Sequence, residues 1–216
     1  MLEIQPKNKL LFMGDSITDA GRSKPEGEGL FDPFGLGYVA FANALLNSTY
    51  PSAPIRVVNK GISGNTTRDL LARWQEDCID QKPDWVSIMI GTNDVWRQFD
   101  MPLYPENCVG LEEYEQNLVK LIETTKPLVK GIVLCTPFFI ESNLNDGMRK
   151  RMDEYSAVVS RLAKQYEVIF VNTQAAFDEY LESNHSSNIS WDRVHPNNVG
   201  HMIIARAFLK AVGYEF

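Results

Sequence analysis

Cysteine and basic residues are both scarce in this chain. The three cysteines, Cys78, Cys108 and Cys135, are widely spaced. An odd number with no CxxC pair excludes a cysteine zinc site and a CxxC redox motif, so we expect three free thiols. Lys and Arg total 21 against 28 Asp and Glu, which gives a net charge of −7. Because such a chain repels a phosphate backbone and an anionic bilayer, we expect no nucleic-acid partner and no membrane partner.

Long apolar runs are absent as well. No run approaches the ~20 residues that a membrane span requires. Residues 1–10 lack the basic region and the long apolar stretch of a signal peptide. With the free thiols, these absences predict a cytoplasmic protein, although a chain whose signal peptide had been removed would share them. The 216 residues contain no repeat, low-complexity tract or Pro/Gly-rich linker, so we expect one domain over residues 1–216.

Five short apolar runs have the length of buried strands. They are residues 9–13, 55–59, 85–90, 131–135 and 168–171. Helical spacing of apolar residues occurs over 69–77, 111–122, 148–166 and 197–212, whereas residues 21–37 are typical of a long loop. The alternation predicts an α/β fold: a three-layer αβα sandwich around a five-stranded parallel sheet with flavodoxin-like strand order. In such sheets ligands bind beyond the carboxyl ends of the strands.

A serine follows the first predicted strand, in the sequence Gly14-Asp15-Ser16. On a tight turn, a serine exposes its hydroxyl and its own N–H to an incoming carbonyl group. The same residues also suit a helix cap or a turn. The triplet alone therefore does not define a nucleophile.

Two further loops carry hydrogen-bond donors. Gly64 follows the second predicted strand, where an exposed N–H could donate to an oxyanion, although a cap at Thr66 or Thr67 explains this turn equally well. Asn93 follows the third predicted strand, where its amide could supply another donor or could form an Asx-turn.

An acid and a histidine lie close together near the C-terminus, as Asp192 and His195. Pro196 keeps the chain out of a helix after His195, so the pair can face one cleft, with the acid orienting the ring and the ring acting as a base. His185 lies in a polar segment and is expected to be solvated. His201 lies on the last predicted helix, where packing or surface exposure is expected.

The order serine, acid, histidine occurs in catalytic triads on α/β scaffolds, but the GxSxG elbow of the larger α/β hydrolases is absent. The blocks Gly14-Asp15-Ser16, Gly64, Asn93 and Asp192-x-x-His195 resemble the four motif blocks of the SGNH (GDSL-type) serine esterases and lipases. Over nearly the whole chain, including LLFMGDSITDAGR and WDRVHPNNVGHMIIARAFL, the sequence is most similar to the branch of intracellular acetylxylan esterases of Geobacillus type. Ile17 replaces the leucine of the GDSL name, which alters no reacting group.

The resemblance implies a role for each matching residue. Ser16 matches the nucleophile, His195 the general base and Asp192 the acid that holds the imidazole. The N–H groups of Ser16 and Gly64 and the side chain of Asn93 match the oxyanion donors. No metal and no cofactor is implied.

The resemblance also implies a substrate and an assembly. The substrate would be an acetylated xylo-oligosaccharide or acetylated xylose, and the assembly a homo-oligomer such as an octamer. Asp15, Trp96 and Trp191 are the residues we expect to bind substrate. Phe99 and Tyr104 also flank the expected site, because aromatic faces suit sugar rings, although half of these aromatic residues would be ordinary core or subunit contacts.

Three alternatives remain open on the sequence. A thioesterase or lysophospholipase of the same superfamily would need a long apolar groove. A sugar-binding protein would not need a serine, a base and an acid. A metal-dependent phosphohydrolase could take its ligands from five residues. These are Asp15, Asn93, Asp94, Asp192 and His195.

Overall fold

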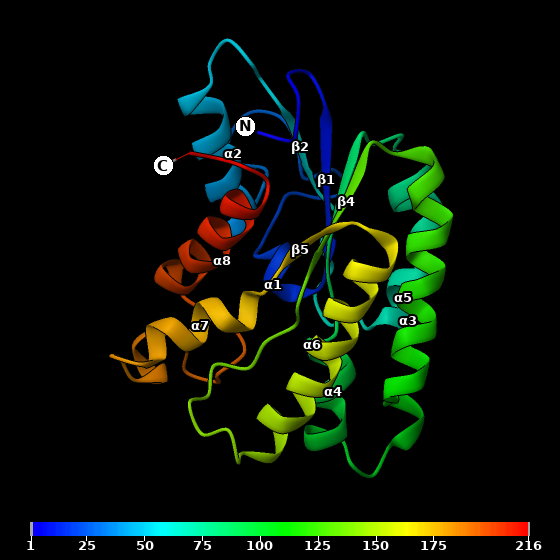
Figure 1. Cartoon of the computed structure of the whole chain (residues 1–216), viewed down its shortest axis with the longest axis vertical. Coiled ribbons are helices and arrows are strands. Elements are labelled where there is room, and N and C mark those ends of the chain that lie inside the picture. Colours follow the sequence, from blue (N-terminus) through cyan, green and yellow to red (C-terminus); the bar gives the residue numbers. More distant parts are fainter. Residues whose placement is uncertain (1, 216) are drawn as a thin grey trace.

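Five parallel strands form the centre of the computed structural model, which describes residues 2–215 (Figure 1). The strands are β1 (Lys9–Gly14), β2 (Arg56–Asn59), β3 (Trp85–Met89), β4 (Gly131–Cys135) and β5 (Ile169–Val171). Their order is β2-β1-β3-β4-β5, and every neighbouring pair is parallel. This arrangement confirms the predicted fold class and strand order.

The strands read as continuous apolar runs because both faces of the sheet are covered. In β1, Leu10 and Phe12 pack into the core on one face, whereas Leu11 and Met13 pack into the core on the other. This division follows from the two-residue period of a strand. When both faces of a sheet are buried, apolar and polar residues do not alternate along its strands. The length of each apolar run is therefore what identifies the strands in this sequence.

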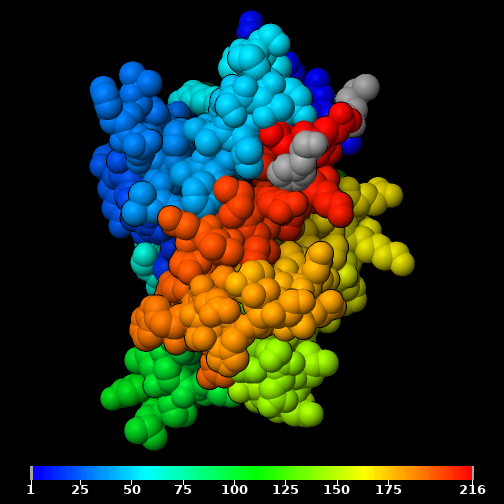
Figure 2. Space-filling model, turned by 90° about the vertical axis from the view of Figure 1, so that its left-hand side faces the viewer, coloured from blue at the N-terminus to red at the C-terminus, as the bar shows by residue number. Residues whose placement is uncertain are grey.

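Helices cover both faces of the sheet (Figure 1). One layer contains α2 (Tyr38–Thr49), α7 (Thr173–Leu181) and α8 (Asn198–Ala211). Figure 2 looks onto this layer, where the red and orange C-terminal segments lie against the light-blue segment from the first quarter of the chain. The other layer contains α3 (Thr67–Ala72), α5 (Leu111–Thr125) and α6 (Gly147–Tyr166).

Three helices were not predicted from the apolar spacing. In α2 and α7 the pattern is weak, and the buried start of α4 (Thr92–Asp100) is largely polar. The helix expected over 69–77 begins earlier, at Thr67, and a π-helical segment, Gln75–Ile79, follows it. Short helical turns complete the chain at Ser16–Asp19 (α1), Pro105–Asn107, Lys126–Leu128 and Ser186–Asn188. Within residues 2–215, no helix has the length and apolar character needed to cross a membrane.

The strand register brings the segments after β1, β3 and β4 to one edge of the sheet. Gly14 lies opposite Met89, and Met89 lies opposite Cys135. Gly91, two residues past β3, has φ +130°, and a Cβ there would lie 2.8 Å from Oη of Tyr114. Only glycine fits this turn without strain. The turn lets α4 begin directly at the sheet edge.

Candidate active site

Ser16, His195 and Asp192 form a hydrogen-bonded chain at this edge. Ser16 is the first residue of α1, directly after β1, and its Oγ lies 2.9 Å from Nε2 of His195. The other ring nitrogen, Nδ1, lies 2.6 Å from Oδ2 of Asp192. The fold thus brings together residues 179 positions apart, in the arrangement expected from the motif blocks.

The carboxylate of Asp192 is held by further donors. Its Oδ1 accepts hydrogen bonds from Oγ of Ser190 at 3.0 Å and from the backbone N–H groups of Val194 at 2.9 Å and His195 at 2.7 Å. Burial alone would raise the pKa of Asp192, but the hydrogen bonds from the His195 ring and these N–H groups hold it below its usual range. Asp192 is therefore ionised at neutral pH and accepts the Nδ1–H of the imidazole.

The loop that carries the pair is fixed at both ends. The backbone N–H of Asn197 donates to the carbonyl of Ile189 at 2.7 Å, and the Asn197 side chain caps α8. Between them, Arg193 adopts φ +65°, and its carbonyl accepts from the N–H of Ile140 at 2.8 Å. The triad loop is thereby tied to the segment after β4.

Gly64 presents an N–H group on the loop after β2. It has φ +84° and is exposed, and within residues 2–215 its N–H donates to no protein acceptor. The preceding residue, Ser63, is held through its N–H and Oγ by Oδ2 of Asp19, at 3.2 and 3.0 Å. The expected cap is also present, because Thr66 forms a capping box with Asp69. The cap explains the turn, and it leaves the glycine N–H available.

The side-chain amide of Asn93 is fixed at both of its polar atoms. Asn93 lies in the first turn of α4, not in an Asx-turn. Its Nδ2 donates to the carbonyl of Asn65 at 3.0 Å, and its Oδ1 accepts from Nη2 of Arg97 at 3.2 Å. An amide nitrogen carries two hydrogens, so one remains for another acceptor.

Arg73 links the segments that carry these donors, a role that no motif in the sequence indicates. Its guanidinium donates to Oδ1 of Asn65 at 2.7 Å, to the carbonyl of Lys60 at 2.9 Å and to the carbonyl of Gly14 at 3.1 Å. Asp77 balances its charge at 2.9 Å. The end of β1 and the loop after β2 are therefore held by one side chain.

Two aspartates lie buried beneath the site. Asp15 is 1% exposed and caps α1 by accepting from the N–H of Ile17 at 3.0 Å. Burial raises its pKa to about 6. Asp94 accepts from both the N–H and Oγ1 of Thr67, and burial raises its pKa to about 7. Both carboxylates are thus engaged by the protein itself.

The five residues considered as metal ligands are not assembled as a metal site. Within residues 2–215, no group of three or more His, Cys, Asp and Glu side chains has an arrangement that could hold a metal ion. Asp15 and Asp94 serve as backbone acceptors, and Asp192 serves His195. This donor arrangement does not favour the phosphohydrolase alternative.

The other two histidines lie outside this chain of hydrogen bonds. His201 is buried, and its Nδ1 accepts from the N–H of Tyr38 at 3.3 Å. Burial, with a smaller effect from His195, lowers the pKa of His201 to about 4, so the ring is neutral. His185 is exposed, as expected from its polar segment.

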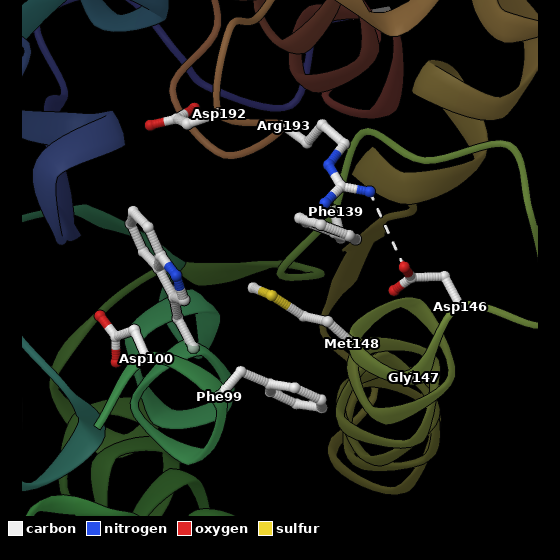
Figure 3. Close-up of a pocket in the computed structure, with 9 residues that line it drawn as sticks. Phe99, Asp100, Phe139, Asp146, Gly147, Met148, Asp192 and Arg193 are labelled. Carbon is white, nitrogen blue, oxygen red and sulfur yellow. Dashed lines mark ion pairs between the residues drawn. The ribbon is translucent and has the colours of Figure 1, made fainter. Parts of the chain in front are cut away.

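A cavity of 320 Å³ adjoins the triad (Figure 3). Trp96 lines it, with its ring centroid 5.7 Å from that of His195, and Phe99 lines it as well. Tyr104 and Trp191 do not line it, and Trp191 is 88% exposed. The remaining lining residues are Asp100, Phe139, Asp146, Gly147, Met148, Asp192 and Arg193.

The chain belongs to the GDSL-like lipase/acylhydrolase family, which matches residues 12–203. It is therefore a carboxylic ester hydrolase by family, as the motif blocks predicted. The fold and the triad geometry described above are those that this assignment requires.

The chain is similar to an acetylxylan esterase both in sequence and in structure. The chain is 59% identical over 215 residues to an acetylxylan esterase of Geobacillus stearothermophilus, covering 100% of this chain and 98% of that protein. The crystal structure of that esterase, Axe2, matches with a TM-score of 0.98 over 99% of this chain and 98% of the other. Variants of Axe2 described as catalytic mutants replace a serine, a histidine and an aspartate by alanine.

The chain is also similar, at lower identity, to two other hydrolases. LAE5, an alpha/beta hydrolase from the metagenome of Lake Arreo, is 51% identical with a TM-score of 0.97, covering 99% of this chain and 98% of LAE5. Thioesterase 1/protease 1/lysophospholipase L1 of Escherichia coli is 28% identical over 201 residues, covering 91% of this chain and 79% of that enzyme. The similarity is thus much stronger to the acetylxylan esterase than to the thioesterase.

Proposed function

We propose that the chain is a serine carboxylesterase that removes acetyl groups from acetylated xylo-oligosaccharides or xylose. The observation that carries the proposal is the chain of hydrogen bonds from Oγ of Ser16 through His195 to Asp192, at 2.9 and 2.6 Å. The 59% identity to an acetylxylan esterase supports the choice of substrate.

Acyl transfer to the enzyme begins at Ser16. Its Oγ attacks the acetyl carbonyl carbon while Nε2 of His195 accepts the hydroxyl proton. Asp192 stabilises the imidazolium that forms and keeps Nδ1 protonated. The tetrahedral intermediate collapses when the imidazolium donates its proton to the alcohol oxygen, which leaves with the sugar.

Water then regenerates the enzyme. His195 accepts a proton from water, and the resulting nucleophile attacks the acetyl-serine carbonyl. Collapse of the second tetrahedral intermediate releases acetate and returns the proton to Oγ of Ser16. Neither step requires a metal or a cofactor, because the serine, the base and the donors supply the chemistry.

The N–H groups of Ser16 and Gly64 and Nδ2 of Asn93 would stabilise the oxyanion. The three segments that carry them are bonded to one another: Ile62 N–H donates to the Gly14 carbonyl at 3.1 Å, and Asn93 donates to the loop after β2. Donors fixed before the reaction stabilise the transition state without reorganisation.

We further propose that the protein is cytoplasmic and forms a homo-oligomer. Cys78, Cys108 and Cys135 are free thiols, and two of them are buried. Large apolar side chains are exposed at Phe31 and Trp191, which suits contacts between copies. Neither a nucleic-acid nor a membrane partner is expected at a net charge of −7.

Light scattering coupled to size-exclusion chromatography tests the homo-oligomer, because it measures the molar mass of the assembly. An octamer would have eight times the mass of one chain.

Hydrolysis of p-nitrophenyl acetate and p-nitrophenyl octanoate, with EDTA present, tests the activity. The wild type should hydrolyse the acetate faster and should be insensitive to EDTA, and Ser16→Ala should lose nearly all turnover. Release of acetate from acetylated xylo-oligosaccharides then tests the substrate. More than about a tenth of the activity left in Ser16→Ala, or its loss with EDTA, would contradict the serine mechanism, and a preference for octanoate would favour the thioesterase alternative.

A further inference from the structure

We propose that the cavity beside Asp192 and His195 binds the alcohol part of the ester, that it takes one uncharged sugar ring, and that it discriminates against alcohols bearing a negative charge. The inference rests on the proposed esterase function and specifies its substrate. It concerns the residues that line the cavity, of which Asp192 alone belongs to the triad and none is a proposed oxyanion donor.

The position of the cavity assigns it to the leaving alcohol. Asp192 lines it, and Trp96 at its wall lies 5.7 Å, centroid to centroid, from the ring of His195. The imidazole must donate its proton to the alcohol oxygen, so the alcohol lies on the imidazole side of the scissile bond. The acetyl oxygen lies toward the proposed donors Gly64, on the loop after β2, and Asn93, in the first turn of α4, neither of which lines the cavity.

The apolar part of the lining suits a sugar ring. Trp96, Phe99 and Phe139 contribute aromatic rings, which pack against the C–H groups of pyranoses. Figure 3 shows the side chains of Phe99, from α4, and Met148, from α6, both reaching into the region between these two helices. A volume of 320 Å³ is at the lower end for ligand cavities, which fits one ring with further units extending into solvent.

The polar part of the lining suits hydroxyl groups. Asp100 and Asp146 offer carboxylate acceptors, and Arg193 offers donors. Arg193 is itself fixed, with Nη1 at 2.6 Å from Glu141 and 3.7 Å from Asp146, and its guanidinium lies 4.8 Å from the Phe139 ring centroid (Figure 3). A long apolar alcohol would meet these charged groups instead of an apolar groove.

The charges around the cavity are predominantly negative. Carboxylates outnumber guanidinium groups in the lining and its direct ion-pair partners. The carboxylates belong to Asp100, Asp146, Asp192 and Glu141, and the guanidinium groups belong to Arg97 and Arg193. An anionic alcohol would therefore be repelled, whereas a neutral sugar would not.

A pair of esters that differ in charge but not in size tests the discrimination. The probes are the acetylated methyl glycosides of glucuronic acid and of its uronamide. At low ionic strength, kcat/KM for the uronamide should exceed that for the uronate by at least about tenfold, and added salt should reduce the difference because it screens the repulsion. Equal rates for the two esters would overturn the proposal.

Asp146→Asn tests the origin of the discrimination. Asp146 caps α6 by accepting from the N–H of Arg149 at 3.0 Å, and asparagine caps a helix equally well, so the fold is retained. The variant should raise the uronate-to-uronamide ratio of kcat/KM by roughly three- to tenfold. Asp32→Asn removes an exposed charge outside the cavity and should leave that ratio unchanged. A ratio that does not move in Asp146→Asn would contradict the charge assignment.

Phe99→Ala tests whether the cavity binds the sugar. The readout is kcat/KM for a monoacetylated methyl xyloside divided by kcat/KM for ethyl acetate, measured on the same preparation. This quotient should fall at least about fivefold in Phe99→Ala, mainly through KM for the xyloside. Leu128→Ala, a change at a 60% exposed leucine just before β4, at the opposite end of that strand from the site, should leave it unchanged.

The two proposals fail in different ways. If Ser16→Ala hydrolysed either simple or sugar esters at the wild-type rate, the esterase function itself would be wrong. If Ser16 were required but the Phe99→Ala quotient stayed at the wild-type value, the esterase function would stand and the sugar would bind elsewhere.

Discussion

Arg97 donates a hydrogen bond from Nη2 to Oδ1 of Asn93 at 3.2 Å, one helical turn along α4. The other end of the amide is fixed by its hydrogen bond to the carbonyl of Asn65. A rotated amide would place Nδ2 against the guanidinium and lose both contacts. Arg97 therefore fixes the orientation of the Asn93 amide, and in the proposed mechanism this sets which atom of Asn93 would face the oxyanion.

Replacing Arg97 by leucine should lower kcat by roughly three- to thirtyfold with little change in KM for p-nitrophenyl acetate, because the donor would be less well oriented. Asn93→Ala should lower kcat by about 10²–10³, the loss found when one oxyanion donor is removed elsewhere. Steady-state kinetics of the two single variants and the double variant measure the coupling. Arg97→Leu should have no further effect in the Asn93→Ala background, and additive losses would contradict the positioning role.

The second prediction concerns Asp192. Asp192→Asn should lower kcat by on the order of 10³–10⁴, because the amide no longer selects the tautomer with a proton on Nδ1. In a His195→Ala background the same change should cost almost nothing more. Since hydrogen bonds hold the pKa of Asp192 below its usual range, its protonation should not limit activity above about pH 4, and a pH–rate profile checks this.

The catalytic motif blocks were predictable because each contributing loop carries a recognisable residue. Ser16, Gly64 and Asn93 follow three strands whose carboxyl ends meet at one edge, and His195 has an acid three residues before it. Hydrogen bonds connect the segments that carry all four. The roles proposed for them rest on residue type and sheet topology, which can be inferred from the sequence.

The residues that hold the site were not predictable in the same way. Arg73 bonds to Gly14, which is 59 positions away, and Arg193 pairs with Glu141, which is 52 positions away. The sequence does not distinguish an arginine with such partners from one that is solvated at the surface, because the partners are distant along the chain. The start of α4 is not predicted for a related reason: Asn93 and Asp94 are buried through hydrogen bonds, and the apolar residues of the helix, Val95, Trp96 and Phe99, lie after its first turn begins.

The third prediction is a pH dependence of stability that arises from Asp94. Its folded-state pKa of about 7 lies above the ordinary value of 3.8, so the folded protein binds this proton more tightly than the unfolded chain. The free energy of unfolding should therefore fall as pH rises from about 4 to 7, and should level off above pH 7. Burial is the cause, since the charged form loses its solvation.

Asp94→Asn isolates this contribution. The variant cannot ionise, so urea unfolding at a series of pH values should show a flatter dependence between pH 4 and 7 than the wild type. Asp32→Asn, at an exposed position, should keep the wild-type slope. If the wild type and Asp94→Asn had the same slope over this range, Asp94 would not be the group that titrates.

The last prediction uses two glycines that both precede a helix. Gly91 caps α4 with φ +130°, whereas Gly110 caps α5 with φ −71° and has no atom within 4 Å of an added Cβ. Replacing either by alanine removes a favourable cap residue, so that loss is common to both. Only Gly91→Ala adds backbone strain and a contact of 2.8 Å with Oη of Tyr114. The extra destabilisation should be about 1–3 kcal/mol, measured by urea unfolding.

Activity distinguishes a local effect at Gly91 from a general loss of stability. Asn93 lies two residues after Gly91, so a displaced first turn of α4 would move its amide away from the oxyanion. Gly91→Ala should therefore lower kcat at temperatures where the variant is still folded, and Gly110→Ala should not. Equal stability and equal kcat in the two variants would mean that the left-handed turn neither strains the backbone nor positions Asn93.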